Sequence, residues 1–189
     1  TAEQRGQEIE HGRLPLAELR RAGGRHVAGE QRRIRPAQGE RLMGFPFQDR
    51  FNRIGGGDIA LRIRERVEAG RVQLPFYYYD ILADGSPVGK ISIRIGDNFH
   101  TYYNGHIGYE INEDARGHGY ARRACALVLD VARFHGMTRL YVTCAEDNAP
   151  SWHTIEGLGG RLLEICEVPR EYFAWYEGIP RHRIYQLDL

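Results

Sequence analysis

Around position 118, the sequence combines glycines and arginines in an order that suits the binding of a charged ligand. Arg116, Gly117 and Gly119 stand immediately before a helical pattern at 120–135. The first turn of a helix has backbone N–H groups without internal partners and carries a partial positive charge. Glycines in front of it let the chain bend and leave no side chain in the way. The stretch therefore predicts a pocket of backbone donors for a phosphate group.

An ordinary glycine-rich turn between a strand and a helix is the alternative interpretation of this loop. No Gly-Lys-Ser/Thr follows, so it is not a Walker loop, and Arg122 stands where the GxGxxG fingerprint has its third glycine. Arg122 and Arg123 lie in the first helical turn, where they would add positive charge for a pyrophosphate. The loop thus fits a phosphate-bearing ligand without matching either nucleotide-binding motif.

The elements that position this loop follow from hydrophobic periodicity after residue 70. Asp84-Gly85 separates two strand-like runs and predicts a hairpin over 74–95. In 105–111, apolar and polar residues alternate, which predicts a strand. Further elements are a helix at 120–135, a strand at 139–144, a short helix that begins at the Asn148 cap, and strands at 161–168 and 182–189. The strands at 105–111 and 139–144 flank a helix and should therefore lie parallel and adjacent, in a mixed α/β sheet.

The first 70 residues give weaker signals. Apolar runs at 13–24 and 58–70 each predict a helix ended by glycine, and a strand is expected around Ile34. We expect residues 1–32 to be an N-terminal extension and 33–189 to be the domain.

Composition excludes several classes of protein. The 189 residues suit one domain, and the net charge of +1 gives no global attraction to nucleic acid or membrane. No apolar run reaches the length of a membrane helix, and the start lacks the apolar core of a signal peptide. Cys125, Cys144 and Cys166 have no metal-binding spacing, so we expect buried, reduced thiols, no metal site and a cytoplasmic location.

The segment Arg116-Gly117-His118-Gly119-Tyr120-Ala121 fits the Arg/Gln-x-x-Gly-x-Gly/Ala signature of the GNAT superfamily of acyl-CoA-dependent N-acyltransferases. Downstream, Asn148-x-x-Ser151 and the Leu-Gly-Gly element at 158–160 also resemble that family. The resemblance covers 75–189 well and 33–70 loosely. It implies a single-domain α/β fold with a mixed, mostly antiparallel sheet flanked by helices and a splayed, parallel central strand pair.

The resemblance also implies the cofactor, acetyl-CoA, as a co-substrate, and the residues that hold it. Backbone amides from Arg116 to Ala121 should bind the pyrophosphate, with Arg122 adding charge. Ile111 should pair with the pantetheine arm, and its amide or a neighbouring one should stabilise the oxyanion. Asn148 should cap its helix and contact the pantetheine.

Transfer to an amine needs a base, because an amine with a pKa of about 10.4 is mostly charged at neutral pH. Glu110 is the first candidate and His106, on the same strand face, the second. A solvated glutamate and a structural histidine are the alternatives. Many family members use a tyrosine to protonate the leaving thiolate, but Ile155 stands there, so Ser151 is the candidate proton relay. A nucleophilic Cys144 is disfavoured by its apolar strand.

The partner is expected to be a small-molecule or peptide amine. It should bind between the N-terminal helices, the loop at 96–105 and the aromatic segment at 169–183, where Asp97 and Glu171 would attract a cation. A non-catalytic acyl-CoA-binding module is the main alternative to an enzyme. Nucleic-acid binding through the six arginines between Arg20 and Arg35 is disfavoured, and the sequence leaves monomer and homodimer open.

Overall fold

The computed structural model describes residues 44–56 and 58–189. The predicted strand around Ile34, the helix at 13–24 and the extension at 1–32 lie outside these residues. The elements in chain order are η1 (Asp49–Phe51), β1 (Arg53–Gly56), β2 (Ile59–Val67), β3 (Phe76–Ala83), β4 (Ser86–Arg94), α2 (Phe99–Asn104), β5 (Ile107–Ile111), η2 (Glu113–Ala115), α3 (Tyr120–Phe134), β6 (Arg139–Ala145), α4 (Ala149–Gly157), β7 (Arg161–Cys166) and β8 (His182–Asp188).

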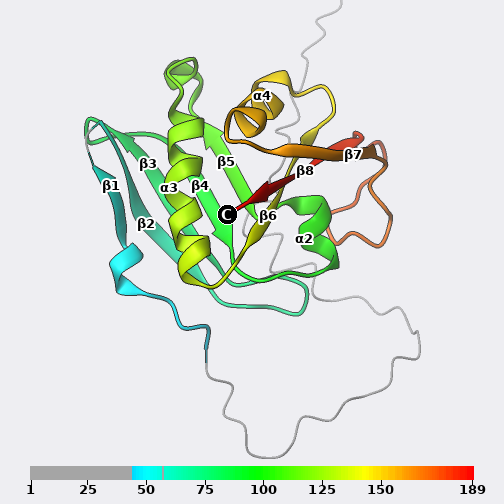
Figure 1. The fold of residues 1–189 in the computed structure, drawn as a ribbon, viewed down its shortest axis with the longest axis horizontal. Coiled ribbons are helices and arrows are strands. Elements are labelled where there is room, and N and C mark those ends of the chain that lie inside the picture. The colour runs from blue at the N-terminus through cyan, green and yellow to red at the C-terminus, as the bar shows by residue number, and fades with distance from the viewer. Residues whose placement is uncertain (1–43, 57) are drawn as a thin grey trace, which may run out of the picture. The chain divides into compact units, whose positions relative to one another are not determined.

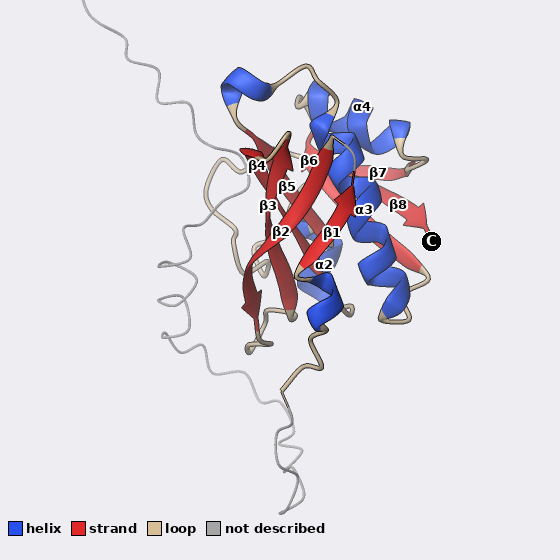
Figure 2. Cartoon of the chain, turned by 90° about the vertical axis from the view of Figure 1, so that its left-hand side faces the viewer, coloured by secondary structure: helices blue, strands red, loops and turns tan. Residues whose placement is uncertain are grey.

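The strands form two sheets that meet at one edge. The first sheet has the order β1-β2-β3-β4-β5 and the second the order β6-β8-β7, and every strand pairing within them is antiparallel. Helix α3 connects β5 to β6 and packs on the first sheet, while α4 packs beside α3 and β6 (Figure 1). Figure 2 shows α3 and α4 on the same side of the five-stranded sheet. The predicted mixed α/β fold is confirmed.

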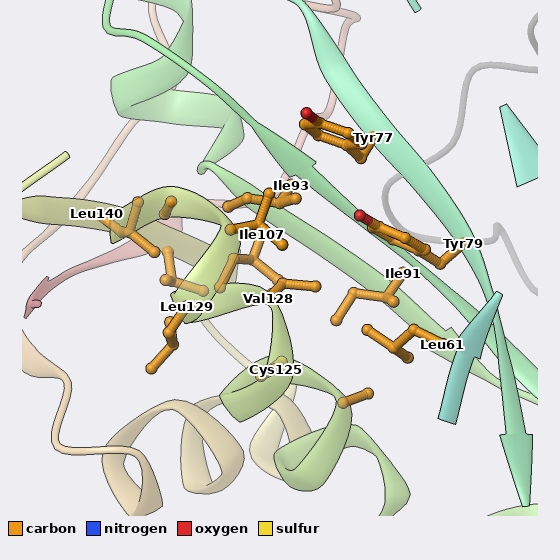
Figure 3. Packing of buried hydrophobic residues seen from close by; sticks show 14 of the residues in the cluster. Leu61, Tyr77, Tyr79, Ile91, Ile93, Ile107, Cys125, Val128, Leu129 and Leu140 are labelled. Atoms are coloured by element: carbon orange, nitrogen blue, oxygen red, sulfur yellow. The ribbon is translucent and has the colours of Figure 1, made fainter. Parts of the chain in front are cut away.

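The hydrophobic core lies between α3 and the first sheet. Alternate strand residues point toward the helix, and α3 presents its apolar stripe to them (Figure 3). The labelled contributors are Leu61, Tyr77, Tyr79, Ile91, Ile93 and Ile107 from the strands, Cys125, Val128 and Leu129 from α3, and Leu140 from β6. This packing fixes where α3 begins, and therefore where the glycine loop lies.

The predicted helix at 58–70 is wrong, because this segment contains β2. Ile59 and Leu61 are buried and Ile63 is half-buried, whereas Arg62 and Arg64 on either side of Ile63 are exposed and form ion pairs with Asp80 on β3. That alternation has the period of a strand, and the pairing with β3 decides between the two interpretations.

The segment at 96–105, expected to be a loop, contains helix α2. Asn98 caps it: the side-chain oxygen accepts a hydrogen bond from the Thr101 N–H at 2.9 Å. The hairpin at Asp84-Gly85 is confirmed, with both residues at positive φ.

Candidate active site

The loop before α3 offers unpaired backbone donors. Gly117 and Gly119 have φ values of 81° and 71°, which only glycine adopts easily. In the described part of the chain, the amides from Gly117 to Arg122 donate to no carbonyl or side chain. A Cβ atom added at either glycine would meet nothing within 4 Å. The loop is therefore an open cradle of donors, which fits a pyrophosphate group.

The two arginines of the first turn behave differently. The guanidinium of Arg123 donates to the His118 carbonyl at 2.9 Å, pairs with Asp58 and lies over the Tyr120 ring. It therefore holds the loop in shape. Arg122 is exposed and forms no ion pair with a described residue, so its charge remains available to a ligand.

Beside the cradle, β5 and β6 begin together and then separate. In the described chain, one backbone hydrogen bond joins the two edges, from the His106 N–H to the Tyr141 carbonyl at 2.7 Å. Beyond this junction the strands belong to different sheets. The Asn112 N–H donates to Val88 on β4, so by strand alternation the Ile111 amide points away from β4, toward the opening. The opening can accept an extended chain along Ile111.

His106 maintains this junction. Its side chain is 1% exposed, and its Nδ1 accepts a hydrogen bond from the Tyr141 N–H at 2.8 Å. Its Nε2 is 2.9 Å from the Gly96 carbonyl, to which it donates. Burial lowers the pKa of His106, so the ring is neutral. Both nitrogens are occupied, and this geometry favours the structural alternative for His106. Its role as a second candidate base stays a prediction.

One side of the opening is formed by β5 and the start of α4. Asn148 caps α4 by accepting from the Ser151 N–H at 3.2 Å. The Ser151 hydroxyl lies 2.9 Å from the Tyr109 hydroxyl. Burial raises the pKa of Tyr109 to about 12, so its phenol is protonated and can donate. Tyr109 was not singled out from the sequence within the alternating strand at 105–111; its phenol at a strand position next to Glu110 was the available signal.

The residues around Tyr109 and Ser151 differ in what they can contribute to chemistry. Ile155, where the family tyrosine would stand, is 1% exposed in the core. Cys144 is buried, and burial raises its pKa to about 11, which disfavours a reactive thiolate. Glu110 lies on the opposite face of β5 from Tyr109, half-buried and paired in register with Lys90 on β4.

The aromatic segments expected around the acceptor do come together. Helix α2 and the 169–183 segment meet through Tyr172, whose hydroxyl hydrogen-bonds Asn104, and through the ring contact of His100 with Phe173. Asp97 pairs loosely with Arg139 at 3.9 Å, and Tyr102 donates to Glu164 at 2.6 Å. These contacts make a packed aromatic wall beside the junction of β5 and β6.

The described residues contain neither a cluster of metal ligands nor a helix that could span a membrane. Within 44–56 and 58–189, no three His, Cys, Asp or Glu side chains gather as metal ligands would. None of the helices in that part of the chain has the length and apolar character needed to cross a membrane.

Comparison with known proteins places this geometry in a family. The model of the Acetyltransferase (GNAT) family matches residues 46–160, more than half of the chain. A structure from Vibrio cholerae, described as a ribosomal-protein-serine acetyltransferase, is similar with a TM-score of 0.51 at 17% identity, covering 72% of this chain and 97% of that one. No curated protein matches the sequence.

Two complexes with related ligands are also similar. RimJ from Mycobacterium smegmatis with CoA-disulfide has 22% identity and a TM-score of 0.47, covering 60% of this chain and 53% of that one. The microcin C7 self immunity acetyltransferase MccE with acetyl-CoA and AMP has 20% identity and a TM-score of 0.47, covering 60% and 61%. This chain thus matches less than two thirds of the length of either protein. On the strength of the family match and the shared fold, the chain belongs to the GNAT acetyltransferase family.

Proposed function

We propose that this chain transfers an acetyl group from acetyl-CoA to an amine by direct attack. One observation carries the proposal: the unpaired amides from Gly117 to Arg122 form an open cradle directly beside the opening between β5 and β6. A diphosphate in the cradle leaves the extended arm of the same molecule free to run along Ile111. Family membership supports the same ligand.

In this reaction, the amine nitrogen bonds to the thioester carbonyl carbon and the carbon–sulfur bond breaks. The nitrogen loses a proton and the sulfur gains one, giving an amide and a free thiol. Glu110 takes the proton from the nitrogen, directly or through water. Ser151 donates a proton to the sulfur and recovers one from Tyr109, whose hydroxyl lies 2.9 Å away.

The remaining residues position the reactants. The Ile111 N–H donates to the oxygen that becomes negative during attack. Asn148 fixes the first turn of α4, so that the Ser151 hydroxyl faces β5. Arg122 adds charge next to the cradle. Holding amine and thioester together accounts for a large part of the rate.

A non-catalytic acyl-CoA-binding module is the second candidate, and the buried Ile155 in place of the family tyrosine favours it. Both candidates bind coenzyme A, but only the enzyme releases its thiol when acetyl-CoA and an amine are present together. A thiol-release assay over a panel of amines separates them.

The cradle is tested by calorimetry with coenzyme A and the variant Gly119→Val. A side chain there points into the open space before α3 and strains the backbone, so we expect the dissociation constant to rise at least tenfold. Gly136→Val is the matched control, because Gly136 ends the same helix with φ of 77° and nothing within 4 Å of an added Cβ. Equal affinities for the two variants would show that the loop does not hold the diphosphate.

A further inference from the structure

An arginine that forms no ion pair with any described residue lies on the face of the sheet opposite α3. Arg94 ends β4, and its Nη1 donates to the Gly105 carbonyl at 3.4 Å. With the Asn104 amide oriented to donate to the Tyr172 hydroxyl, its oxygen accepts from both Nε and Nη2 of Arg94 at 3.2 Å. The guanidinium also lies 5.7 Å from the centre of the Phe76 ring. All of these partners of the guanidinium are uncharged groups.

Within residues 44–56 and 58–189, the charge of Arg94 is therefore not balanced by a neighbouring carboxylate. Among the described residues, no carboxylate lies within ion-pair distance of it, whereas Arg62, Arg64, Arg66 and Arg181 all have such partners. Burial lowers the pKa of Arg94, although a guanidinium stays charged at any physiological pH. A shielded, unbalanced cation costs free energy, and a bound anion would recover that cost.

The position of this cation relates it to the acetyl-transfer site. Nη1 of Arg94 lies 3.6 Å from the point where a side chain on Gly108 would begin. Gly108 is two residues before Glu110 on β5, so both positions face the same side of the sheet, about 7 Å apart along the strand. An amine that approaches Glu110 therefore has Arg94 within the length of a small molecule.

The absence of a side chain at Gly108 makes this arrangement possible. The Ser92 hydroxyl, opposite Gly108 on β4, lies 3.2 Å from the same point and donates to the Gly108 carbonyl. Any larger residue at 108 would occupy the space between Arg94 and the strand. Gly108 and Ser92 together leave a small polar floor between the cation and the proposed base.

We propose that Arg94 binds a carboxylate of the acceptor, so that the acceptor is a free amino acid or a similar small amine that carries a carboxylate. This inference rests on the proposed acetyl transfer. The amine faces Glu110 and the carboxylate faces Arg94 across Gly108. A polyamine has no carboxylate, and a protein N-terminus has an amide where the free amino acid has its acid group.

The test compares amino acids with their own carboxamides, in which an uncharged amide replaces the carboxylate. Because this change also lowers the pKa of the amine, rates are compared per neutral amine. L-Alanine and L-phenylalanine are assayed against L-alaninamide and L-phenylalaninamide by thiol release, with spermidine and an alanine-led tetrapeptide amide as further acceptors. Binding of each compound is measured by thermal shift with and without coenzyme A. We expect at least one acid to exceed its amide about tenfold in kcat/KM, as loss of a charge-assisted hydrogen bond predicts.

Variants assign that preference to the guanidinium. In Arg94→Gln the preference disappears through KM for the amino acid, while KM for acetyl-CoA stays within twofold. Arg94→Lys retains the charge and part of the preference, and it replaces Arg94→Gln if that variant does not fold. Arg64→Gln, an exposed arginine of the same sheet, leaves the preference unchanged.

The two proposals fail in different ways. If coenzyme A does not bind, the proposed function fails, yet stabilisation by the acids alone would still support an anion site at Arg94. If coenzyme A binds but amides, spermidine or the peptide match the acids in turnover and in thermal shift, the Arg94 inference is overturned and acetyl transfer stands. A preference for acids that persists in Arg94→Gln overturns it as well.

Discussion

At the scale of single residues, two neighbouring side chains of β5 lie on opposite faces of the strand and have different roles in the proposed reaction. Tyr109 points toward α3 and α4, where its hydroxyl meets Ser151. Glu110, the next residue, points to the other face, which also carries Ser92 and Arg94. Neighbouring side chains of a strand point to opposite faces. Tyr109 can therefore act, through Ser151, on the leaving sulfur, while Glu110 acts on the attacking nitrogen.

The role of Glu110 as base is tested by Glu110→Gln, which keeps the shape of the side chain and removes its capacity to take a proton. We expect kcat to fall about 100-fold, as the loss of general-base catalysis predicts, with unchanged affinity for coenzyme A. The loss should diminish at high pH, where more of the free amine is already neutral. Rates are measured by thiol release between pH 6 and 10.

Glu113→Gln is the control for this experiment, because Glu113 is an exposed carboxylate three residues further along the chain. It should leave the rate unchanged. A Glu110→Gln variant that turns over at the wild-type rate would transfer the role of base to water or to another residue.

At the scale of elements, the active opening depends on one junction, where β5 and β6 separate after His106. The imidazole bridges the Tyr141 N–H and the Gly96 carbonyl, and thereby joins the second sheet to the segment that follows β4. Asp97 and Arg94 are the charged groups that influence this ring, with opposite effects on its pKa. A protonated ring could no longer accept from Tyr141.

The neutral state of His106 predicts a pH dependence of stability. Burial lowers its pKa in the folded protein below the ordinary 6.5, so the unfolded chain binds the proton more tightly. Its contribution is therefore complete above about pH 6.5 and is lost as the pH falls through the folded-state pKa. Urea unfolding from pH 5 to 8 should show a falling free energy of unfolding below pH 6.5.

His106→Gln should reduce that slope, although His100 and His135, whose pKa values are also lowered by burial, will keep part of it. His153→Gln replaces an exposed histidine and should leave the slope intact. Equal slopes for both variants would contradict a neutral imidazole at the junction.

The elements also show which parts of the fold could be predicted from sequence. The hairpin at Asp84-Gly85, α3, β6 and α4 were predicted because glycine turns, an asparagine cap and clear periodicity act locally. Strand β2 was predicted as a helix, because its partner β3 decides its conformation. The meeting of Tyr109 with Ser151, and of Arg94 with Asn104, depends on chain segments far apart in sequence, which no local pattern encodes.

At the scale of the whole molecule, stability depends on the core between α3 and the first sheet. Two tyrosines in this core differ in the hydrogen bonding of their hydroxyl groups. Tyr77 and Tyr79 are both fully buried on β3, and their rings stack at 6.2 Å. The Tyr77 hydroxyl accepts from the Gln48 N–H at 2.9 Å and lies 3.0 Å from Nε2 of His135. The Tyr79 hydroxyl has no hydrogen-bond partner in the described structure.

Replacing each tyrosine by phenylalanine should therefore affect the free energy of unfolding differently. Tyr77→Phe leaves the Gln48 amide and His135 unpaired and should cost about 1–3 kcal/mol, whereas Tyr79→Phe removes a buried hydroxyl without a partner and should be neutral or stabilising by about 1 kcal/mol. The same ring and burial in both make each variant the control of the other. Urea unfolding of the two proteins measures the difference, and an equal loss in both would mean that the Tyr79 hydroxyl is hydrogen-bonded in solution.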